Sequence, residues 1–259
     1  FYTIARFIAL KDSGLSASVA GSQIRHPVTG RSVGTGWVDG SKPETLQYNR
    51  ELLMEVAASG VDEINLDYIR YPTEYAPSQI GLTGAEKGER IGHFLTMARE
   101  AINSAGKGTK LGISTYAILG WNFPVNFEPL GQDIPRFANM VDIISPMAYP
   151  ATFAAGHYYI PGKNPRSRMY YLVWRTLDGH KKLVGPENVH KLRPWIQGYY
   201  AGAKDLQDQI DAVYDAGLCG FTVWSAGNFY DTLYSVWKKQ PDRANTCTVT
   251  SFDVATPVQ

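Results

Sequence analysis

The stretch from Val61 to Pro72 constrains this chain more than any other, because it places a carboxylate inside an apolar run. The run follows a helical segment that stops at Gly60, so it predicts a strand buried on both faces. Side chains alternate along a strand, and Asn65 and Asp67 therefore share one face. Asp67 comes near the carboxyl end, which is where parallel sheets and barrels carry their chemistry.

The composition limits the classes of binding partner that we expect. A length of 259 residues fits one large α/β domain, which we place at residues 1–245 with a polar tail at 246–259. The net charge of +1 gives no reason to expect nucleic acid or an anionic membrane surface. No run of about 18 apolar residues predicts a membrane span. The 16 tyrosines and 6 tryptophans are typical of sites for polar, ring-shaped ligands, although most will serve packing.

Cysteine and histidine add little chemistry. Cys219 and Cys247 are too few for a disulfide framework or a zinc site. They are expected at the same end of the fold, where they can pair if the compartment is oxidising. The five histidines show no metal-ligand spacing, so we expect no metal and no cofactor. The chain starts at Phe1 without a methionine, which indicates a processed or trimmed product.

Strand and helix patterns alternate along the chain. Strands are predicted near residues 2–12, 61–72, 110–117, 141–150, 192–200 and 220–226, with helices between them. About six strand–helix units predict parallel pairing through right-handed crossovers. No phosphate-cradling Gly-x-Gly-x-x-Gly follows any strand, which favours a TIM (β/α)8-type barrel over a doubly wound nucleotide-binding sheet. Such a barrel normally has eight strands, two more than are visible.

Several local expectations follow. Residues 13–40 are rich in Gly and Ser without a period, so they predict a long loop over the carboxyl end of the first strand. Residues 41–44 read as a capping box at the start of a helix. Glu128 is expected on an aromatic loop. Asp133 is expected at a helix start, and Asp142 at the amino end of a strand in a structural role.

Six short motifs carry a resemblance to a known family. They are Leu66–Pro72, Ile4–Arg6, Lys11–Asp12, Ser145–Pro150, Pro194–Gln197 and Val223–Trp224. Together they resemble a family of bacterial glycoside hydrolase-like (β/α)8 barrels that is distantly akin to the alpha-amylase clan. The resemblance implies a secreted or cell-envelope glycoside hydrolase that acts on a polysaccharide. It also implies that the first two strands lie upstream of Phe1 or in a second chain.

Glycoside cleavage requires two carboxyl groups across the scissile bond. Asp67 is the candidate nucleophile or base, held ionised by Arg6 and Arg70, or else one half of an ion pair that only fixes the barrel. Asp12, one strand away, is the first candidate for the second carboxyl group, and Glu128 is the second. Each of the two can also be an ordinary surface acid.

Aromatic and amide side chains complete the predicted site. Those expected to contact sugar are Tyr116, Trp121, Tyr149 and Trp224 by stacking, and Asn65 and Gln197 by hydrogen bonding. Packing of the barrel mouth is the alternative. Ser114 stands where the resemblance implies an acid, which motivates a rival function as an inactive carbohydrate-binding or structural barrel. An amidase or deacetylase would need a metal or nucleophile that the sequence does not show.

Overall fold

The computed structural model describes residues 1–239, which form two compact units. The first unit holds residues 1–115 and 122–144, and the second holds residues 116–121 and those from 145 onward. The predicted tail at 246–259 and the predicted pairing of Cys219 with Cys247 lie outside the described residues. Strands and helices alternate along the described chain, and the strand pairs within each unit are parallel, so the α/β class is confirmed.

Strand β2 is the central strand of the first unit. Strands β1 (Ile4–Ile8), β2 (Glu63–Asp67) and β3 (Lys110–Tyr116) pair in that order, and only the last residue of β3 belongs to the second unit. Every residue of β2 is buried, as its apolar run predicts. Arg6 pairs with Asn65 and Ile8 with Asp67 across β1 and β2. The register therefore brings the ends of these two strands together at Asp67.

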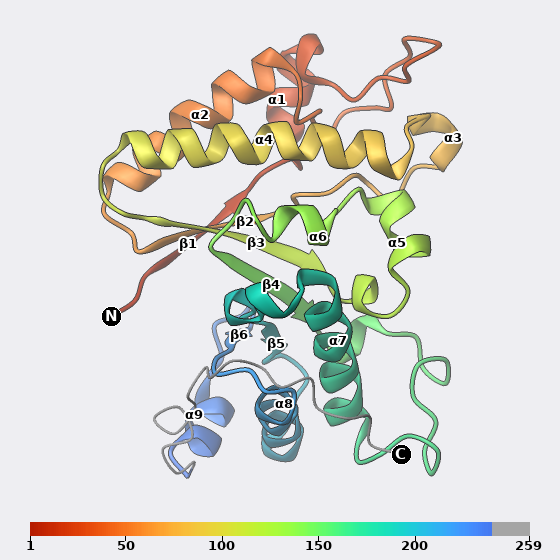
Figure 1. Cartoon of the computed structure of the whole chain (residues 1–259), viewed down its shortest axis with the longest axis vertical. Coiled ribbons are helices and arrows are strands. Elements are labelled where there is room, and N and C mark those ends of the chain that lie inside the picture. The colour runs from red at the N-terminus through yellow and green to blue at the C-terminus, as the bar shows by residue number, and fades with distance from the viewer. Residues whose placement is uncertain (240–259) are drawn as a thin grey trace. The chain divides into compact units, whose positions relative to one another are not determined.

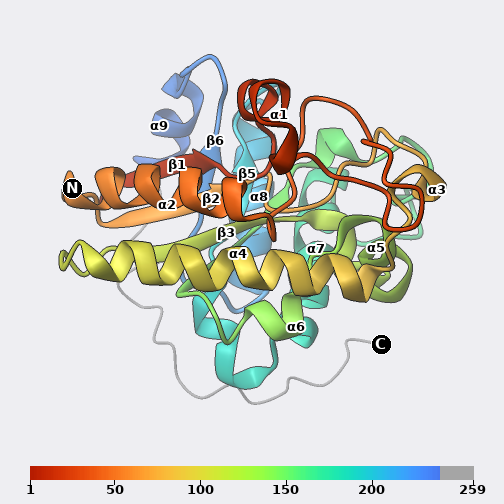
Figure 2. The same ribbon diagram turned by 90° about the horizontal axis from the view of Figure 1, so that it is seen from above.

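Two long helices lie side by side along β1–β3 (Figures 1 and 2). They are α2 (Pro43–Ala58) and α4 (Gly84–Ser104). Thr83 and Glu86 form a capping box at the start of α4. The prediction of a capping box at residues 41–44 was wrong. The hydroxyl of Ser41 donates to Asp39 at 2.8 Å instead, and α2 begins without a side-chain cap.

The segment 13–40 is not the structureless loop that its composition predicts. It contains α1 (Ser13–Ser18), the 3-10 turn η1 (Ala20–Ser22) and two isolated bridges that pair Gln23 with Val38 and Arg25 with Ser32. The buried carboxylate of Asp39 forms an ion pair with Arg90 of α4. Local hydroxyl and carboxylate bonds organise this segment, and they leave no hydrophobic period in the sequence.

Short helices complete the first unit. They are α3 (Pro77–Ile80), α5 (Phe123–Leu130) and α6 (Ile134–Phe137). The expectation that Glu128 lies on a loop was wrong, because it is part of α5. Asp133 caps α6, as predicted. The structural role of Asp142 is confirmed, because its carboxylate accepts from Arg99 at 2.7 Å and from the Leu111 amide at 2.8 Å.

The second unit repeats the strand and helix alternation. Its strands β4 (Ile143–Ala148, the first two residues belonging to the first unit), β5 (Trp195–Gln197) and β6 (Thr222–Trp224) are parallel and in sequence order. The strands β5 and β6 are shorter than predicted. The helices are η2 (Ala117–Gly120), η3 (Pro150–Thr152), α7 (Arg168–Val184), η4 (Pro186–Lys191), α8 (Ala203–Asp215) and α9 (Asp231–Trp237).

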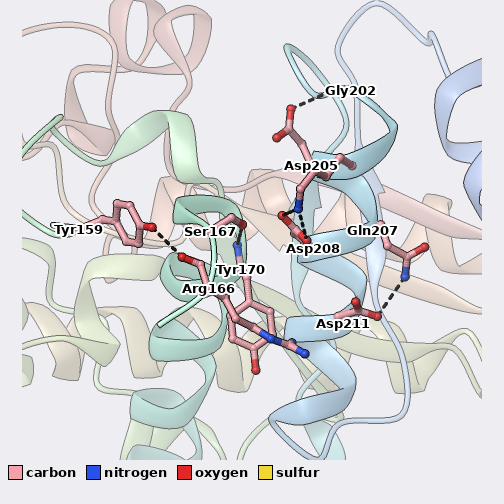
Figure 3. A network of polar contacts seen from close by, with 10 residues as sticks. Tyr159, Arg166, Ser167, Tyr170, Gly202, Asp205, Gln207, Asp208 and Asp211 are labelled. Carbon is pink, nitrogen blue, oxygen red and sulfur yellow. Dashed lines mark hydrogen bonds and ion pairs between the residues drawn. The ribbon is translucent and has the colours of Figure 1, made fainter. Parts of the chain in front are cut away.

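The loop between β4 and α7 is tied down by arginines. The guanidinium of Arg168 donates to the carbonyls of Pro150 and Phe153 at 2.9 and 2.7 Å. Arg166 forms an ion pair with Asp215 of α8. The carbonyl of Arg166 accepts from the hydroxyl of Tyr159 at 2.6 Å (Figure 3). The loop therefore has fixed contacts at both of its ends.

Candidate active site

The centre of the candidate site is an ion pair between Arg6 and Asp67. Nε and Nη2 of Arg6 lie 2.8 and 2.6 Å from Oδ2 of Asp67. The other oxygen, Oδ1, accepts from the backbone amide of Tyr68 at 2.7 Å. The side chain of Asp67 is 11% exposed and that of Arg6 is 35% exposed. These charge-assisted bonds occupy both oxygens and fix the orientation of the carboxylate, and the contact between Arg6 and Asp67 is the predicted one.

Tyr68 is in a strained backbone conformation directly after Asp67. Its φ of 54° lies in the left-handed region, where a large non-glycine residue is uncommon. Such outliers persist where the surrounding structure enforces them, and they concentrate at functional sites. The amide that bonds Oδ1 of Asp67 belongs to this strained residue.

A cluster of rings and cations surrounds Tyr68. Its ring lies 5.8 Å from that of Trp37, and Nζ of Lys11 lies 4.9 Å from the Tyr68 ring centre. The guanidinium of Arg70 lies 4.7 Å from the Trp37 ring, and it donates to the carbonyl of Tyr71 at 2.8 Å. Arg6 thus forms an ion pair with Asp67, and the guanidinium of Arg70 lies over the ring of Trp37.

Trp37 contacts the ring of Tyr68 and bonds Glu74, but neither Trp37 nor Glu74 was among the predicted site residues. The indole N–H of Trp37 donates to Glu74 at 2.6 Å and joins segment 13–40 to the loop after β2. Burial raises the pKa of Glu74, but the hydrogen bonds from Trp37 and from backbone amides together lower it by more. The pKa of Glu74 therefore lies below its usual value. The one available signal was a lone tryptophan in a stretch rich in Gly and Ser.

A buried polar row runs across β2 and β3 behind Asp67. The amide of Asn65 donates to Glu63 at 3.1 Å and accepts from the hydroxyl of Ser114 at 2.8 Å. Glu63 also accepts from the hydroxyl of Tyr2 at 3.1 Å. A Cβ at Gly112 would lie 2.6 Å from the Glu63 carboxylate, so this glycine makes room for the row. Glu63 was also missed, although it shares the alternation of Asn65 and Asp67.

The two predicted partners of Asp67 each have a local structural contact. Asp12 caps α1 by accepting from the Leu15 amide at 2.8 Å. Glu128 accepts from the Gly84 amide at 3.0 Å, at the start of α4, and its carbonyl accepts from Lys87 at 2.8 Å. These contacts explain why both acids are held in place, and a catalytic role for either stays a prediction.

Three predicted binding residues lie at the ends of strands in the second unit. Tyr149 follows β4, and its ring lies 5.9 Å from that of Tyr199. The buried amide of Gln197 accepts from the Ala151 amide and donates to the Tyr199 carbonyl, both at 2.8 Å. Trp224, at the end of β6, meets Trp195 edge to face at 6.2 Å.

Trp121 packs into an aromatic cluster of the second unit. Its indole N–H donates to Thr176 at 3.0 Å, and its ring lies 5.3 Å from those of Phe153 and Tyr158. Tyr116 is half-buried at the end of β3, directly before η2. The structure therefore places Trp121 in packing contacts and leaves its predicted role with sugar as a prediction.

Three acids of α8 each have a contact within the helix or at its start. Asp205 accepts from the Gly202 amide at 3.0 Å, Asp208 pairs with Lys204 at 2.9 Å, and Asp211 accepts from Gln207 at 3.0 Å (Figure 3). In residues 1–239, no three His, Cys, Asp or Glu side chains gather as a metal site requires. Over the same residues, no helix is long and apolar enough to span a membrane.

Comparison with solved structures defines the class of fold. The glycoside hydrolase domain of PgaB (BpsB) from Bordetella bronchiseptica matches with a TM-score of 0.66 at 13% identity, over 96% of this chain and 76% of that one. A class V chitinase from Pseudomonas fluorescens matches with a TM-score of 0.56 at 14% identity, over 78% and 73% of the two chains. The fold is thus of the TIM-barrel type found in glycoside hydrolases, as predicted.

A third structure supports the same fold, and a family model shows the family to which the chain belongs. An N-acetylglucosaminidase of glycoside hydrolase family 18 from Paenibacillus barengoltzii matches with a TM-score of 0.55 at 14% identity, over 77% of each chain. No curated protein matches this sequence. The family described as "Putative glycosyl hydrolase domain" matches residues 1–230, and the chain belongs to that family. The predicted resemblance to a glycoside hydrolase family is confirmed at this level.

Proposed function

We propose that this protein is a glycoside hydrolase that cleaves glycosidic bonds of a polysaccharide, with Asp67 as nucleophile or base. Family membership supports the reaction class. The observation that carries the proposal is the Arg6–Asp67 pair, an oriented carboxylate at the carboxyl end of β2. We further propose that the protein works outside the cell or in the cell envelope, where such polymers are found.

The chemistry requires one ionised and one protonated carboxyl group. We assign Asp67 the role of nucleophile or base because Arg6 and the Tyr68 amide hold its two oxygens in one orientation. Glu74 does not suit the acid role, because its lowered pKa keeps it ionised. Asp12 follows the strand next to β2 and is our first candidate for the acid, with Glu128 as the second.

A panel of glycans tests the proposal. Release of reducing ends is measured with soluble polysaccharides and with chitin oligosaccharides, which are included because one structural relative is named a chitinase and another an N-acetylglucosaminidase. The wild type is compared with Asp67→Asn and with the control Asp178→Asn, which alters only a surface pair with Lys182. We expect activity in the wild type and the control only. Equal activity in all three proteins would remove Asp67 from the mechanism.

Ser114 favours one alternative, a barrel that binds carbohydrate without cleaving it. Its hydroxyl is bonded to Asn65 in the buried row, at the position where related sequences are expected to carry an acid. In the same panel, glycan binding without product, unchanged by Asp67→Asn, would support this alternative. Loss of product together with retained binding in Asp67→Asn would support the hydrolase.

A further inference from the structure

We propose that Tyr149, Tyr199 and Tyr200 form a platform on which a sugar ring of the bound glycan stacks. The three rings are referred to below as the tyrosine platform. The proposal rests on the proposed function for the chemical class of the ligand, a carbohydrate. It adds a binding site in the second unit, with two residues, Tyr199 and Tyr200, that the sequence did not indicate.

The rings form a continuous row. Tyr149 and Tyr199 meet at 5.9 Å with an angle of 70° between their planes, and Tyr199 and Tyr200 meet at 5.6 Å with an angle of 79°. Tyr149 follows β4 and the other two follow β5, and these strands are paired neighbours. The row therefore lies at the carboxyl ends of the strands, the end at which barrel enzymes bind substrate.

Tyr200 is both strained and exposed. Its φ is 49°, in the left-handed region that disfavours a large side chain, and the residue is 92% exposed. An exposed ring gains nothing from burial that would offset this strain. A functional contact with a ligand supplies the missing reason for a tyrosine at this position.

The backbone beneath the platform is held rigidly. The buried amide of Gln197 bonds both the Tyr199 carbonyl and the Ala151 amide, and so links the loops that carry Tyr199 and Tyr149. Gln209 in turn bonds the backbone of Gln197 on both sides, at 2.9 and 3.0 Å. Gln197 thus acts as a positioning residue. A surface that is ordered before binding loses less entropy when the ligand arrives.

The next loop along the sheet shows the same combination. After β6, Asn228 has a φ of 57° and is followed by Phe229, which is 78% exposed. Two adjacent loops of the second unit therefore present an exposed ring, in one loop on a left-handed residue and in the other directly after one. Aromatic faces pack against the C–H faces of sugar rings while hydroxyl groups remain in water, so a carbohydrate is the occupant that this chemistry favours.

The test uses glycan affinity and stability together. Asp67→Asn serves as the background, so that binding is measured without turnover, by electrophoresis through gels containing glycol chitin, laminarin or hydroxyethylcellulose. Tyr200→Gly relieves the backbone strain and removes the ring, Tyr200→Trp keeps a ring, and Tyr234→Ala removes another exposed tyrosine from the second unit. The Tm of each variant is measured in parallel.

The proposal predicts that Tyr200→Gly weakens retardation about three- to tenfold while its Tm stays level or rises. Tyr200→Trp and Tyr234→Ala should bind as the background does. Unchanged retardation in Tyr200→Gly, no retardation of the background by any of the glycans, or a lower Tm with unchanged binding would overturn the platform. Tyr200-dependent retardation in a protein whose wild type cleaves nothing would overturn the hydrolase function and leave the platform standing.

Discussion

Arg6 bonds one oxygen of Asp67 through two nitrogens, while the other oxygen of Asp67 rests on the amide of Tyr68. The carboxylate is therefore held by partners from two neighbouring segments, strand β1 and the turn after β2. An acid held this firmly reacts from one orientation, which is what positioning for catalysis requires.

Replacing Arg6 tests whether this positioning matters. Arg6→Gln should lower kcat/KM on the order of 100-fold, since the carboxylate loses its charge partner and its fixed orientation. The kcat/KM of Arg6→Lys should lie between those of the wild type and Arg6→Gln, because a lysine keeps the charge but cannot reproduce both bonds. Steady-state kinetics on a substrate identified with the glycan panel provides the measurement. Arg31→Gln, at an exposed position, is the control, and equal kinetics for Arg6→Gln and Arg31→Gln would contradict the role of Arg6.

Trp37→Phe should loosen segment 13–40. The change removes the bond to Glu74 and should cost on the order of 1 kcal/mol of stability, and the pKa of Glu74 should rise towards its usual value. Limited trypsin digestion reports the effect as faster cleavage after the exposed Arg25 and Arg31. Trp121→Phe loses an equivalent bond in the second unit and serves as control. Cleavage at the same rate in both variants would show that Trp37 does not anchor the segment.

His180 should make stability depend on pH. Its full burial lowers its pKa to about 4 from 6.5, against the opposing effect of the bond to the Thr176 carbonyl. The unfolded chain therefore takes up a proton below pH 6.5 that the folded protein does not take up until about pH 4. Stability is complete above that window and falls through it by about 1.4 kcal/mol per pH unit.

Urea unfolding at pH 7, 5.5 and 4.5 measures this dependence. The unfolding free energy of the wild type should fall by roughly 3 kcal/mol as the pH approaches 4. In His180→Gln the overall stability is lower, but this part of the slope should disappear. An identical slope in both proteins would contradict the assignment.

Gly179 should tolerate no side chain. A Cβ at this position would lie 1.7 Å from the carbonyl oxygen of Gly120, so helix α7 and turn η2 would have to separate. Gly179→Ala should destabilise by at least about 1–3 kcal/mol, measured by chemical denaturation. Gly220→Ala is the matched control in the same unit, because a Cβ there meets nothing within 4 Å. Similar losses in both variants would refute the close contact.

The sequence predicted what short-range patterns determine. The burial of β2 follows from its apolar run, and the roles of Asp133 and Asp142 follow from their positions at the ends of elements. Helix α5 was missed because Pro129 lies inside it, and proline is a poor sign of a helix unless it falls in the first turn, as Pro124 does.

Contacts between residues that are far apart in the chain could not be predicted from the sequence. The bond between Trp37 and Glu74 joins residues 37 positions apart, and no local pattern indicates it. The left-handed conformations of Tyr68 and Tyr200 contradict the preference of tyrosine, so they are imposed by surroundings that only the folded chain supplies. The exposure of Tyr200 likewise could not be predicted, because nothing in the sequence distinguishes it from the other tyrosines.

A crystal structure of Asp67→Asn with an oligosaccharide that the wild type cleaves is the most direct measurement. We expect the substituted side chain at position 67 to lie within about 3–3.5 Å of the anomeric carbon at the scissile bond, or of a water beside that carbon. A sugar chain bound with its scissile bond away from position 67 would contradict the role of Asp67 as the catalytic carboxylate.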